Sequence, residues 1–324
     1  MMDEQRQRQT TIVGVTGATG FVGRAVCRRL VEEGYAVRAL SRNGTVVPGA
    51  AENVATGDLL AADLPRLVAD CEAVVHCAAR VHVTAREEAA AAERAYAESN
   101  ARLPLRLTEV ARAAGVRRFV QLSSAAAIAS ISAPGETITD ATQPRPRSPY
   151  GRSKLAADTE LSALVGGDFA VVSLRPPAIF GPGVGAWFAM FDRAASAGLP
   201  LPLGRIPNRR SFVFVDNVAD AVAAAVARGP SGAYLVTDSP PISSGDLYAR
   251  LVALHGHRRR VFALPTPLVR GAARLALGER ADSLIGDAAF DGSRFTDHFG
   301  WNAPVPLDKG LALTVGAAPD ETRL

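Results

Sequence analysis

The amino-acid sequence predicts an α/β fold in which a doubly wound parallel sheet is followed by a smaller, mixed C-terminal domain. In the first half of the chain, short apolar runs alternate with segments of helical periodicity. These runs are apolar throughout rather than at every second residue, which is typical of parallel strands covered by helices on both faces. A glycine-rich turn joins the first apolar run to the first helical segment.

The elements of the first half follow one another as strand and helix. The first strand is "TIVGVTG", and the helix after it ends at Gly34. A longer helical stretch covers about residues 87–114 and is ended by Gly115. The expected strands span residues 11–17, 36–42, 53–58, 72–79, 117–124 and 169–177.

The second half has a different texture, rich in glycine and proline from Phe180 onward. "SFVFVDNVADAVAAAVARG" predicts a strand plus a helix, "GAYLVTD" predicts another strand, and about residues 240–306 are helical with proline breaks. We therefore expect a sheet domain and a second domain that is not cleanly separable from it. The expected limits are 10–180 with a return segment at 211–238 for the sheet domain, 181–210 and 239–311 for the second, and 1–9 and 312–324 for tails.

The composition is that of an ordinary globular protein, with 324 residues, 48% hydrophobic residues and a net charge of +4. Cys27, Cys71 and Cys77 lack C-x-x-C spacing, so we expect buried free thiols rather than disulfides or zinc ligands. The histidines show no metal-ligand spacing, and we expect no metal. The polar N-terminus and the lack of a long apolar run predict a cytoplasmic enzyme without a membrane span. "HGHRRRVFAL" predicts a solvated helix end rather than a nucleic-acid surface.

The turn after the first strand reads "VTGATGFVG" and spaces Gly17, Gly20 and Gly23 as G-x-x-G-x-x-G. Glycines there let the backbone turn tightly and approach a pyrophosphate, whose charge faces the helix N-terminus. Because the pattern lies between a strand and a helix, it predicts a dinucleotide-binding, Rossmann-type domain. The alternative is a plain turn with incidental glycines.

The end of the second strand predicts which dinucleotide binds. Ser41 and Arg42 stand where an acidic residue would bind the adenosine ribose of NAD. A guanidinium there favours a 2′-phosphate, so we expect NAD(P) with NADP(H) favoured over NAD. A simply solvated Arg42 is the alternative. Asp58, in "GDL", can accept from the adenine amino group or can form a turn.

The stretch "SPYGRSK" carries the expected acid–base group. Lysine occurs only at Lys154 and Lys309, and Lys154 follows Tyr150 by four residues on one face of a helix capped by Ser148. We expect the ammonium to lower the pKa of the phenol, so that Tyr150 exchanges protons near neutral pH. An incidental surface pair is the alternative.

Two further polar positions lie near that group. Ser123 and Ser124 end the fifth strand, where a hydroxyl can hydrogen-bond the reacting oxygen beside Tyr150, and we favour Ser124. Asn100 is unfavourable in the middle of a helix. We therefore expect its side chain to hold a water or to bond the backbone.

These motifs together resemble the extended short-chain dehydrogenase/reductase family, also called the NAD-dependent epimerase/dehydratase family. The likeness covers about residues 11–311, with "TGATGFVG", "GDL", "HCAA", Asn100, "LSS", "YGRSK", "IFGPG" and "RRSFVFVDN" in family order. It implies Ser124, Tyr150 and Lys154 as the catalytic set, with Asn100 supporting them through a water. The implied cofactor-binding residues are Gly17, Thr19, Gly20, Phe21, Val22, Gly23, Ser41, Arg42, Asp58, Leu59, Cys77, Ala78, Ala79, Tyr150, Lys154 and Pro177.

Within that family the chain looks most like bacterial UDP-sugar 4-epimerases and 4-ketoreductases, which are linked to surface-polysaccharide sugars. The likeness implies a nucleotide-sugar substrate, contacted by Arg80, Ser124, Tyr150 and Arg210. Arg210 matches an arginine that contacts the diphosphate in UDP-sugar relatives, although an exposed loop arginine is the alternative. Alanines at 125–127 replace the acidic pair of dehydratases, which disfavours dehydration. Ala178 stands where several 4-epimerases have an asparagine, which leaves the sugar open.

Three functions remain to be weighed. The first is hydride transfer at C4 of a nucleotide-linked hexose, by a 4-ketoreductase or a 4-epimerase. The second is NADPH-dependent reduction of a carbonyl on a lipid, steroid or flavonoid, and the third is a dinucleotide-binding protein without turnover. The resemblance also implies a possible homodimer formed by the helices that contain Asn100 and Tyr150.

Overall fold

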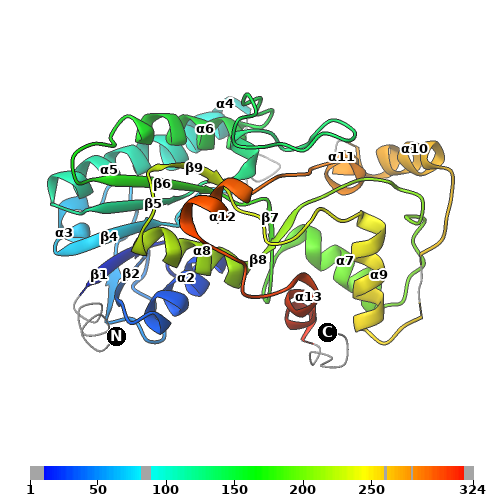
Figure 1. Cartoon of the computed structure of the whole chain (residues 1–324), viewed down its shortest axis with the longest axis horizontal. Coiled ribbons are helices and arrows are strands. Elements are labelled where there is room, and N and C mark those ends of the chain that lie inside the picture. Colours follow the sequence, from blue (N-terminus) through cyan, green and yellow to red (C-terminus); the bar gives the residue numbers. More distant parts are fainter. Residues whose placement is uncertain (1–10, 82–88, 259–260, 279, 317–324) are drawn as a thin grey trace.

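The computed structural model describes residues 11–81, 89–258, 261–278 and 280–316, and Figure 1 shows their arrangement. Among them, no helix is both long enough and apolar enough to cross a membrane. In the same residues, no group of three or more histidine, cysteine or acidic side chains could hold a metal ion. Cys27 and Cys71 are buried, Cys77 is partly buried, and all three are free thiols.

Seven parallel strands form one sheet in the order β3-β2-β1-β4-β5-β6-β9, which confirms the predicted doubly wound fold. The strands are β1 (Ile12–Thr16), β2 (Ala36–Ser41), β3 (Glu52–Ala55), β4 (Cys71–His76), β5 (Arg118–Leu122), β6 (Ala170–Arg175) and β9 (Gly232–Leu235). The strand order reverses between β1 and β4. Ligands of such sheets bind beyond the carboxyl ends of the strands at this switch point.

Helices cover both faces of the sheet (Figure 1). On one face, α2 (Phe21–Glu32) and α8 (Val215–Ala227) pack on the apolar side chains of the central strands. On the other face lie α3 (Leu64–Val68), α5 (Leu103–Ala113) and α6 (Pro149–Ser162). Because both faces are buried, consecutive residues of the central strands are buried, and most of them are apolar.

The expected long helix before β5 is interrupted. It consists of α4 (Ala89–Ala97), a π-helical turn at Glu98–Arg102 and α5, whereas the sequence predicted one continuous helix over about 87–114. Residues 82–88 lie outside the described part of the chain. Asn100 lies in the π-helical turn, and its amide bonds the backbone of Arg80. π-Helical turns of this kind are often found at functional sites.

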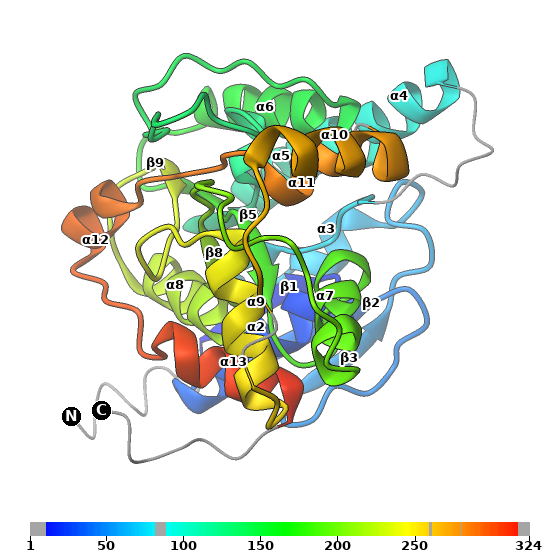
Figure 2. The ribbon, with the colours of Figure 1, turned by 90° about the vertical axis from the view of Figure 1, so that its right-hand side faces the viewer.

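Most of the remaining elements gather beside the sheet, at the right of Figure 1 and facing the viewer in Figure 2. β7 (Ala178–Phe180) pairs with β8 (Phe212–Phe214) in a separate two-stranded sheet, so the strand predicted in "SFVFVDN" lies outside the large sheet. The helices are α7 (Ala186–Ser196), α9 (Ser244–Leu254), α10 (Thr266–Leu277), α11 (Arg280–Ile285), α12 (Ser293–Phe299) and α13 (Leu307–Val315). Of these, α12 lies next to β9 of the large sheet.

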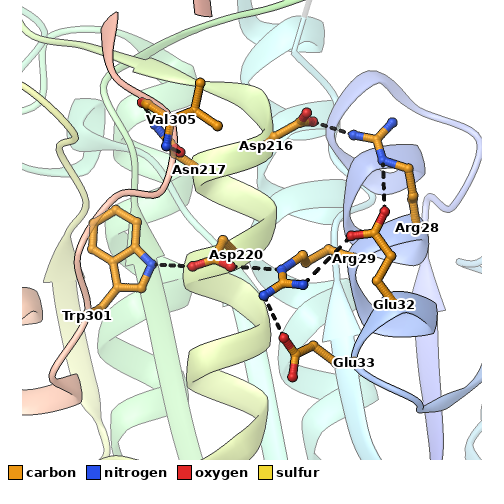
Figure 3. A network of polar contacts seen from close by, with 9 residues as sticks. All are labelled: Arg28, Arg29, Glu32, Glu33, Asp216, Asn217, Asp220, Trp301 and Val305. Atoms are coloured by element: carbon orange, nitrogen blue, oxygen red, sulfur yellow. Dashed lines mark hydrogen bonds and ion pairs between the residues drawn. The ribbon is translucent and has the colours of Figure 1, made fainter. Parts of the chain in front are cut away.

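A network of polar contacts fastens α8 to α2, the helix that follows the glycine turn (Figure 3). Asp220 of α8 accepts from Arg29 of α2 at 2.8 Å and from the indole of Trp301 at 2.8 Å. Asn217 bonds the backbone of Val305 in both directions. Helix α8, which begins within the motif "FVFVDN", therefore links the last turns of α2 to the C-terminal segment.

Candidate active site

The glycine turn between β1 and α2 is packed so closely that it excludes side chains. Gly17 has a φ of 66°, and a Cβ added to it would lie 2.7 Å from the backbone nitrogen of Ala78. A Cβ on Gly23 would lie 2.1 Å from the carbonyl oxygen of Gly17. Both distances are shorter than any van der Waals contact. The turn therefore needs glycine at these positions and comes directly against the segment after β4.

The N-terminus of α2 is suited to an anionic group. Its N-cap residue is Gly20, so no side chain caps the first backbone N–H groups. These N–H groups and the helix dipole together favour a phosphate. Thr19, Phe21 and Val22 surround this end of the helix, and the Thr19 carbonyl accepts from Arg24 at 2.8 Å. The residues of this turn thus fit the pyrophosphate of a dinucleotide.

Replacing Gly23 by alanine is expected to lower the free energy of unfolding by about 1–3 kcal/mol, because the new methyl group would overlap the Gly17 carbonyl. Cofactor binding should be lost with it. Thermal denaturation and a fluorescence titration with NADH and NADPH measure the two effects. Gly271→Ala, in α10 with nothing within 4 Å, is the control and should keep both properties. Normal cofactor affinity in Gly23→Ala would contradict this account of the turn.

The residues predicted to bind the adenosine part of the cofactor lie at the ends of β2 and β3. Ser41 is buried, and its hydroxyl has no hydrogen-bond partner among the described residues. Arg42 is exposed beside it. Asp58 is exposed, and its carboxylate accepts from the backbone N–H of Leu60 at 3.0 Å, which is the turn-forming alternative, while Leu59 packs on the core. A role of Asp58 in binding adenine stays a prediction.

The end of β4 lies beside the glycine turn. His76 bonds Thr16 through Nδ1 at 2.7 Å, and its buried Nε2 has no partner among the described residues. Burial, with a smaller contribution from the charge of Lys154, lowers the pKa of His76 to about 3, so this ring is neutral. Burial raises the pKa of the Cys77 thiol to about 12. Cys77, Ala78 and Ala79 therefore present an uncharged surface next to the turn.

Tyr150 and Ser124 lie together, as predicted. Helix α6 begins at Pro149 and is capped by the Ser148 hydroxyl, which accepts from Gly151. This places Tyr150 in the first turn of α6. The Ser124 side chain lowers the pKa of the Tyr150 phenol through hydrogen bonding, whereas the Ser123 hydroxyl donates to Asp158 at 2.9 Å. Of the two serines at the end of β5, Ser124 is thus the one at the phenol.

The expected effect of Lys154 on the phenol is wrong. Burial raises the pKa of Tyr150 to about 12, and the hydrogen bond from Ser124 offsets only part of this rise. The amine of Lys154 lies 6.0 Å from the centre of the Tyr150 ring and donates to the Leu122 carbonyl at 2.8 Å. Burial also lowers the pKa of Lys154 to about 8, with Asp158 acting in the opposite direction. The expectation counted the neighbouring charge and left out the desolvation of both groups.

Asn100 has the backbone-bonding role that the sequence predicted as one of two possibilities. Its amide accepts from the N–H of Arg80 and donates to the carbonyl of Arg80, both at 2.9 Å. It also lies 3.3 Å from the Ser153 hydroxyl, which donates to the Tyr150 carbonyl. Asn100 thereby connects the segment after β4 to the first turn of α6. Its proposed support of catalysis through a water stays a prediction.

The predicted diphosphate contact is held by the segment that follows α11. Arg210 donates to the Gly286 carbonyl at 2.9 Å, and burial lowers its pKa to about 10, which the charge of Asp287 partly offsets. None of its hydrogen bonds among the described residues joins it to Ser124, Tyr150 or Lys154. Pro177 lies just before β7, and the Pro176 carbonyl accepts from Ala125.

Sequence reasoning missed Tyr96 and Asp158. Tyr96 packs edge-on against Tyr150, with ring centres 6.1 Å apart. Asp158 is a buried carboxylate on α6, one turn beyond Lys154. The spacing i, i+4, i+8 from Tyr150 was the available signal for Asp158, because it places the three residues on one side of the helix.

Comparisons with known proteins agree with this arrangement. Residues 13–236 match the model of the NAD dependent epimerase/dehydratase family. A UDP-glucose 4-epimerase of Vibrio cholerae is 31% identical, with 94% of each chain covered. A ceramide reductase of Caulobacter vibrioides is 32% identical over 67% of this chain and 60% of its own. The solved structure of MoeE5 in complex with UDP-glucose and NAD is 25% identical, with a TM-score of 0.74 over 94% of this chain and 97% of its own.

The family match covers more than two thirds of the chain and includes the glycine turn, the seven-stranded sheet, and the Ser124, Tyr150 and Lys154 positions. The chain belongs to the NAD-dependent epimerase/dehydratase family.

Proposed function

We propose that this protein transfers a hydride at C4 of a nucleotide-linked hexose, as a 4-epimerase or a 4-ketoreductase. The observation that carries the proposal is that the end of β5 and the first two turns of α6 bring Ser124, Tyr150 and Lys154 together, with the Lys154 amine donating to the Leu122 carbonyl. The 31% identity to a UDP-glucose 4-epimerase over 94% of both chains supports a sugar-nucleotide substrate. So does the likeness to a structure that holds UDP-glucose and NAD.

Each residue of the site has a task in this proposal. A bound NAD(P) supplies the hydride exchange, and the glycine turn with the N-terminus of α2 would hold its pyrophosphate. Tyr150 donates a proton to the C4 oxygen as a carbonyl is reduced and removes that proton in the reverse direction. Ser124 holds the same oxygen. Because the pKa of Tyr150 is about 12, the phenol is protonated at neutral pH and is ready to act as the acid.

Positive charge controls the reverse, oxidative step. To act as a base, Tyr150 must lose its proton, and nearby positive charge favours the phenolate. Lys154 does not lower the pKa of Tyr150 in this structure, so the oxidised nicotinamide would supply this charge when it is bound. We therefore propose that the pKa of Tyr150 falls when oxidised cofactor binds.

Whether the protein keeps or exchanges its cofactor distinguishes an epimerase from a ketoreductase. An epimerase oxidises and then reduces on one bound cofactor, whereas a ketoreductase exchanges it. Incubating the purified protein with UDP-hexoses and with 4-keto sugar nucleotides, with and without added NADPH, distinguishes the two. Proton NMR detects inversion at C4, and the absorbance of NADPH in the near ultraviolet detects its consumption. The proposal fails if neither occurs.

We further propose that Arg42 selects NADP(H) over NAD(H), because its exposed guanidinium follows the strand end where NAD enzymes carry an acidic residue. Arg42→Ala is expected to weaken NADPH binding about 10- to 100-fold, the loss of one charge-assisted contact, and to leave NADH binding unchanged. Fluorescence titration of both cofactors measures this. The control is Arg117→Ala, which removes an exposed arginine between α5 and β5 and should change neither affinity. Equal effects of Arg42→Ala on both cofactors would contradict the assignment.

A second candidate is reduction of a lipid carbonyl, which the 32% identity to a ceramide reductase favours. Such a substrate needs no contact between Arg210 and a diphosphate. Binding of UDP alone separates the two candidates. A thermal shift with UDP that disappears in Arg210→Ala supports the nucleotide sugar, and no shift supports the lipid.

A further inference from the structure

Asp158 is a buried carboxylate in α6 that the proposed chemistry does not use. Its side chain is 2% exposed, and one oxygen, Oδ2, accepts from the Ser123 hydroxyl at 2.9 Å and from Arg175 Nε at 2.7 Å. The other oxygen, Oδ1, is buried without a partner among the described residues. A buried ion pair with an unsatisfied oxygen contributes little to stability on its own. This arrangement therefore needs another explanation.

The two partners of Asp158 are also joined through the backbone. The N–H of Ser123 donates to the Leu174 carbonyl at 2.7 Å, and the N–H of Ala125 donates to the Pro176 carbonyl at 2.9 Å. Arg175 lies between these two carbonyls. A closed ring of hydrogen bonds thus runs from Ser123 to Asp158, to Arg175 and back to the turn after β5. It ties α6 to the ends of β5 and β6.

Ser123 lies in the chain between Leu122, which contacts Lys154, and Ser124, which lies at Tyr150. The carbonyl of Leu122 accepts from the Lys154 amine, and the side chain of Ser124 lowers the pKa of the Tyr150 phenol. Any movement of Ser123 would therefore displace the partner of Lys154 and the partner of Tyr150 together. The same carboxylate that holds Ser123 lies one helical turn beyond Lys154.

We propose that Asp158 is a positioning residue: through Ser123 and Arg175 it fixes the turn that presents the Leu122 carbonyl to Lys154 and the Ser124 hydroxyl to Tyr150. It also supplies the negative charge beside the Lys154 amine. This inference rests on the proposed function in one respect, that Ser124, Tyr150 and Lys154 act on the substrate. The effect of Asp158 on Lys154 can be tested without any substrate.

The groups around Lys154 show why its charge depends on Asp158. His76 has a pKa of about 3, while the Cys77 thiol and the Tyr150 phenol have pKa values of about 12, so these three are uncharged at neutral pH. Asp158 is the carboxylate that favours the ammonium form of Lys154 against burial. Removing this charge must lower the pKa of Lys154, because desolvation then acts with less opposition.

The chain offers a direct measurement, because it contains only two lysines, Lys154 and the exposed Lys309. Protein labelled with ¹³Cε-lysine gives two signals, and the midpoint for Lys154 is expected near pH 8. In Asp158→Asn this midpoint should move to lower pH. In Glu160→Gln, an exposed acid of the same helix, it should stay where it is in the wild type.

The kinetic test uses Ser123→Ala, which removes a hydroxyl without changing any charge. If Ser123 positions Ser124, kcat should fall about 10- to 100-fold at unchanged KM, the cost of a small misplacement. In a Ser124→Ala background the same change should cost much less, because the group it positions is already missing. A chain that converts no sugar nucleotide would defeat the proposed function, while the lysine titration would still decide the role of Asp158.

Asp158→Asn leaves Arg175 buried without its partner, so this variant can fail to fold. The double variant Asp158→Asn, Arg175→Met removes both charges and is the second route to the same measurement. Two results together would overturn the proposal. The first is an unchanged titration midpoint of Lys154 in the double variant, and the second is a Ser123→Ala enzyme with full kcat and only a lower Tm. The ring would then be a structural ion pair and nothing more.

Discussion

Replacing Tyr150 by phenylalanine is expected to lower kcat by about 10²- to 10⁴-fold, which is the usual contribution of a general acid–base group. The phenol hydroxyl is the group whose pKa Ser124 lowers, and the ring itself packs against Tyr96. Because phenylalanine keeps the ring, the fold and the cofactor site should persist. Steady-state kinetics with the sugar nucleotide that the wild type converts, together with cofactor titration, measures both properties.

The matched control is Tyr248→Phe. Tyr248 is fully buried in α9 and donates to the Leu199 carbonyl at 2.6 Å, away from α6. Its loss should lower the free energy of unfolding by about 1 kcal/mol and leave kcat as it is. A Tyr150→Phe enzyme with wild-type kcat would show that the phenol takes no part in the chemistry, which would revive the hypothesis of a dinucleotide-binding protein without turnover.

Replacing Lys154 by methionine is expected to abolish turnover and to stabilise the protein. Burial lowers the pKa of Lys154 from 10.5 to about 8, which means that the folded chain holds the ammonium at a cost. A shift of this size corresponds to about 3 kcal/mol at neutral pH. The Leu122 carbonyl loses its donor in the variant, so we expect a net gain of about 1–2 kcal/mol in the free energy of unfolding.

The stability difference between Lys154→Met and the wild type should depend on pH. The folded pKa lies below the unfolded value, so the destabilisation of the wild type is fully present below pH of about 8 and disappears as the pH rises toward 10.5. Thermal denaturation at neutral pH and at a pH near 10.5 should therefore show a higher Tm for Lys154→Met at neutral pH and a much smaller difference in the alkaline buffer. Lys309→Met, at an exposed position in α13, is the control. A lower Tm for Lys154→Met at neutral pH would contradict the account.

Local patterns in the sequence were sufficient for the sheet and for the main positions of the site. The mostly apolar runs at β1, β4 and β5 follow from burial on both faces of the sheet. Gly17 and Gly23 are recognisable because only glycine tolerates the close backbone approach that the turn makes. Tyr150 and Lys154 are recognisable because helical periodicity alone brings i and i+4 together.

Features that depend on tertiary packing could not be predicted in the same way. The pairing of β7 with β8 joins segments that lie far apart in the chain and leaves no local pattern. The π-helical turn at Glu98–Arg102 arises where Asn100 reaches the backbone of Arg80, a contact between distant parts of the chain. The pKa of Tyr150 depends on how completely the folded chain removes water from it, and helical spacing contains no information on that.

The central claim is that a hydride leaves C4 and returns to it, or arrives there from the cofactor, while Tyr150 moves the proton. The most direct measurement follows a deuterium label at C4 of a UDP-hexose by NMR in the wild type and in Tyr150→Phe, with deuterated NADPH and a 4-keto sugar nucleotide for the reductive direction. We predict that the wild type either inverts C4 with the deuterium retained or transfers deuterium from NADPH to C4. Tyr150→Phe should do neither at a comparable rate. Loss of the C4 label to solvent, or equal rates in both proteins, would contradict the account.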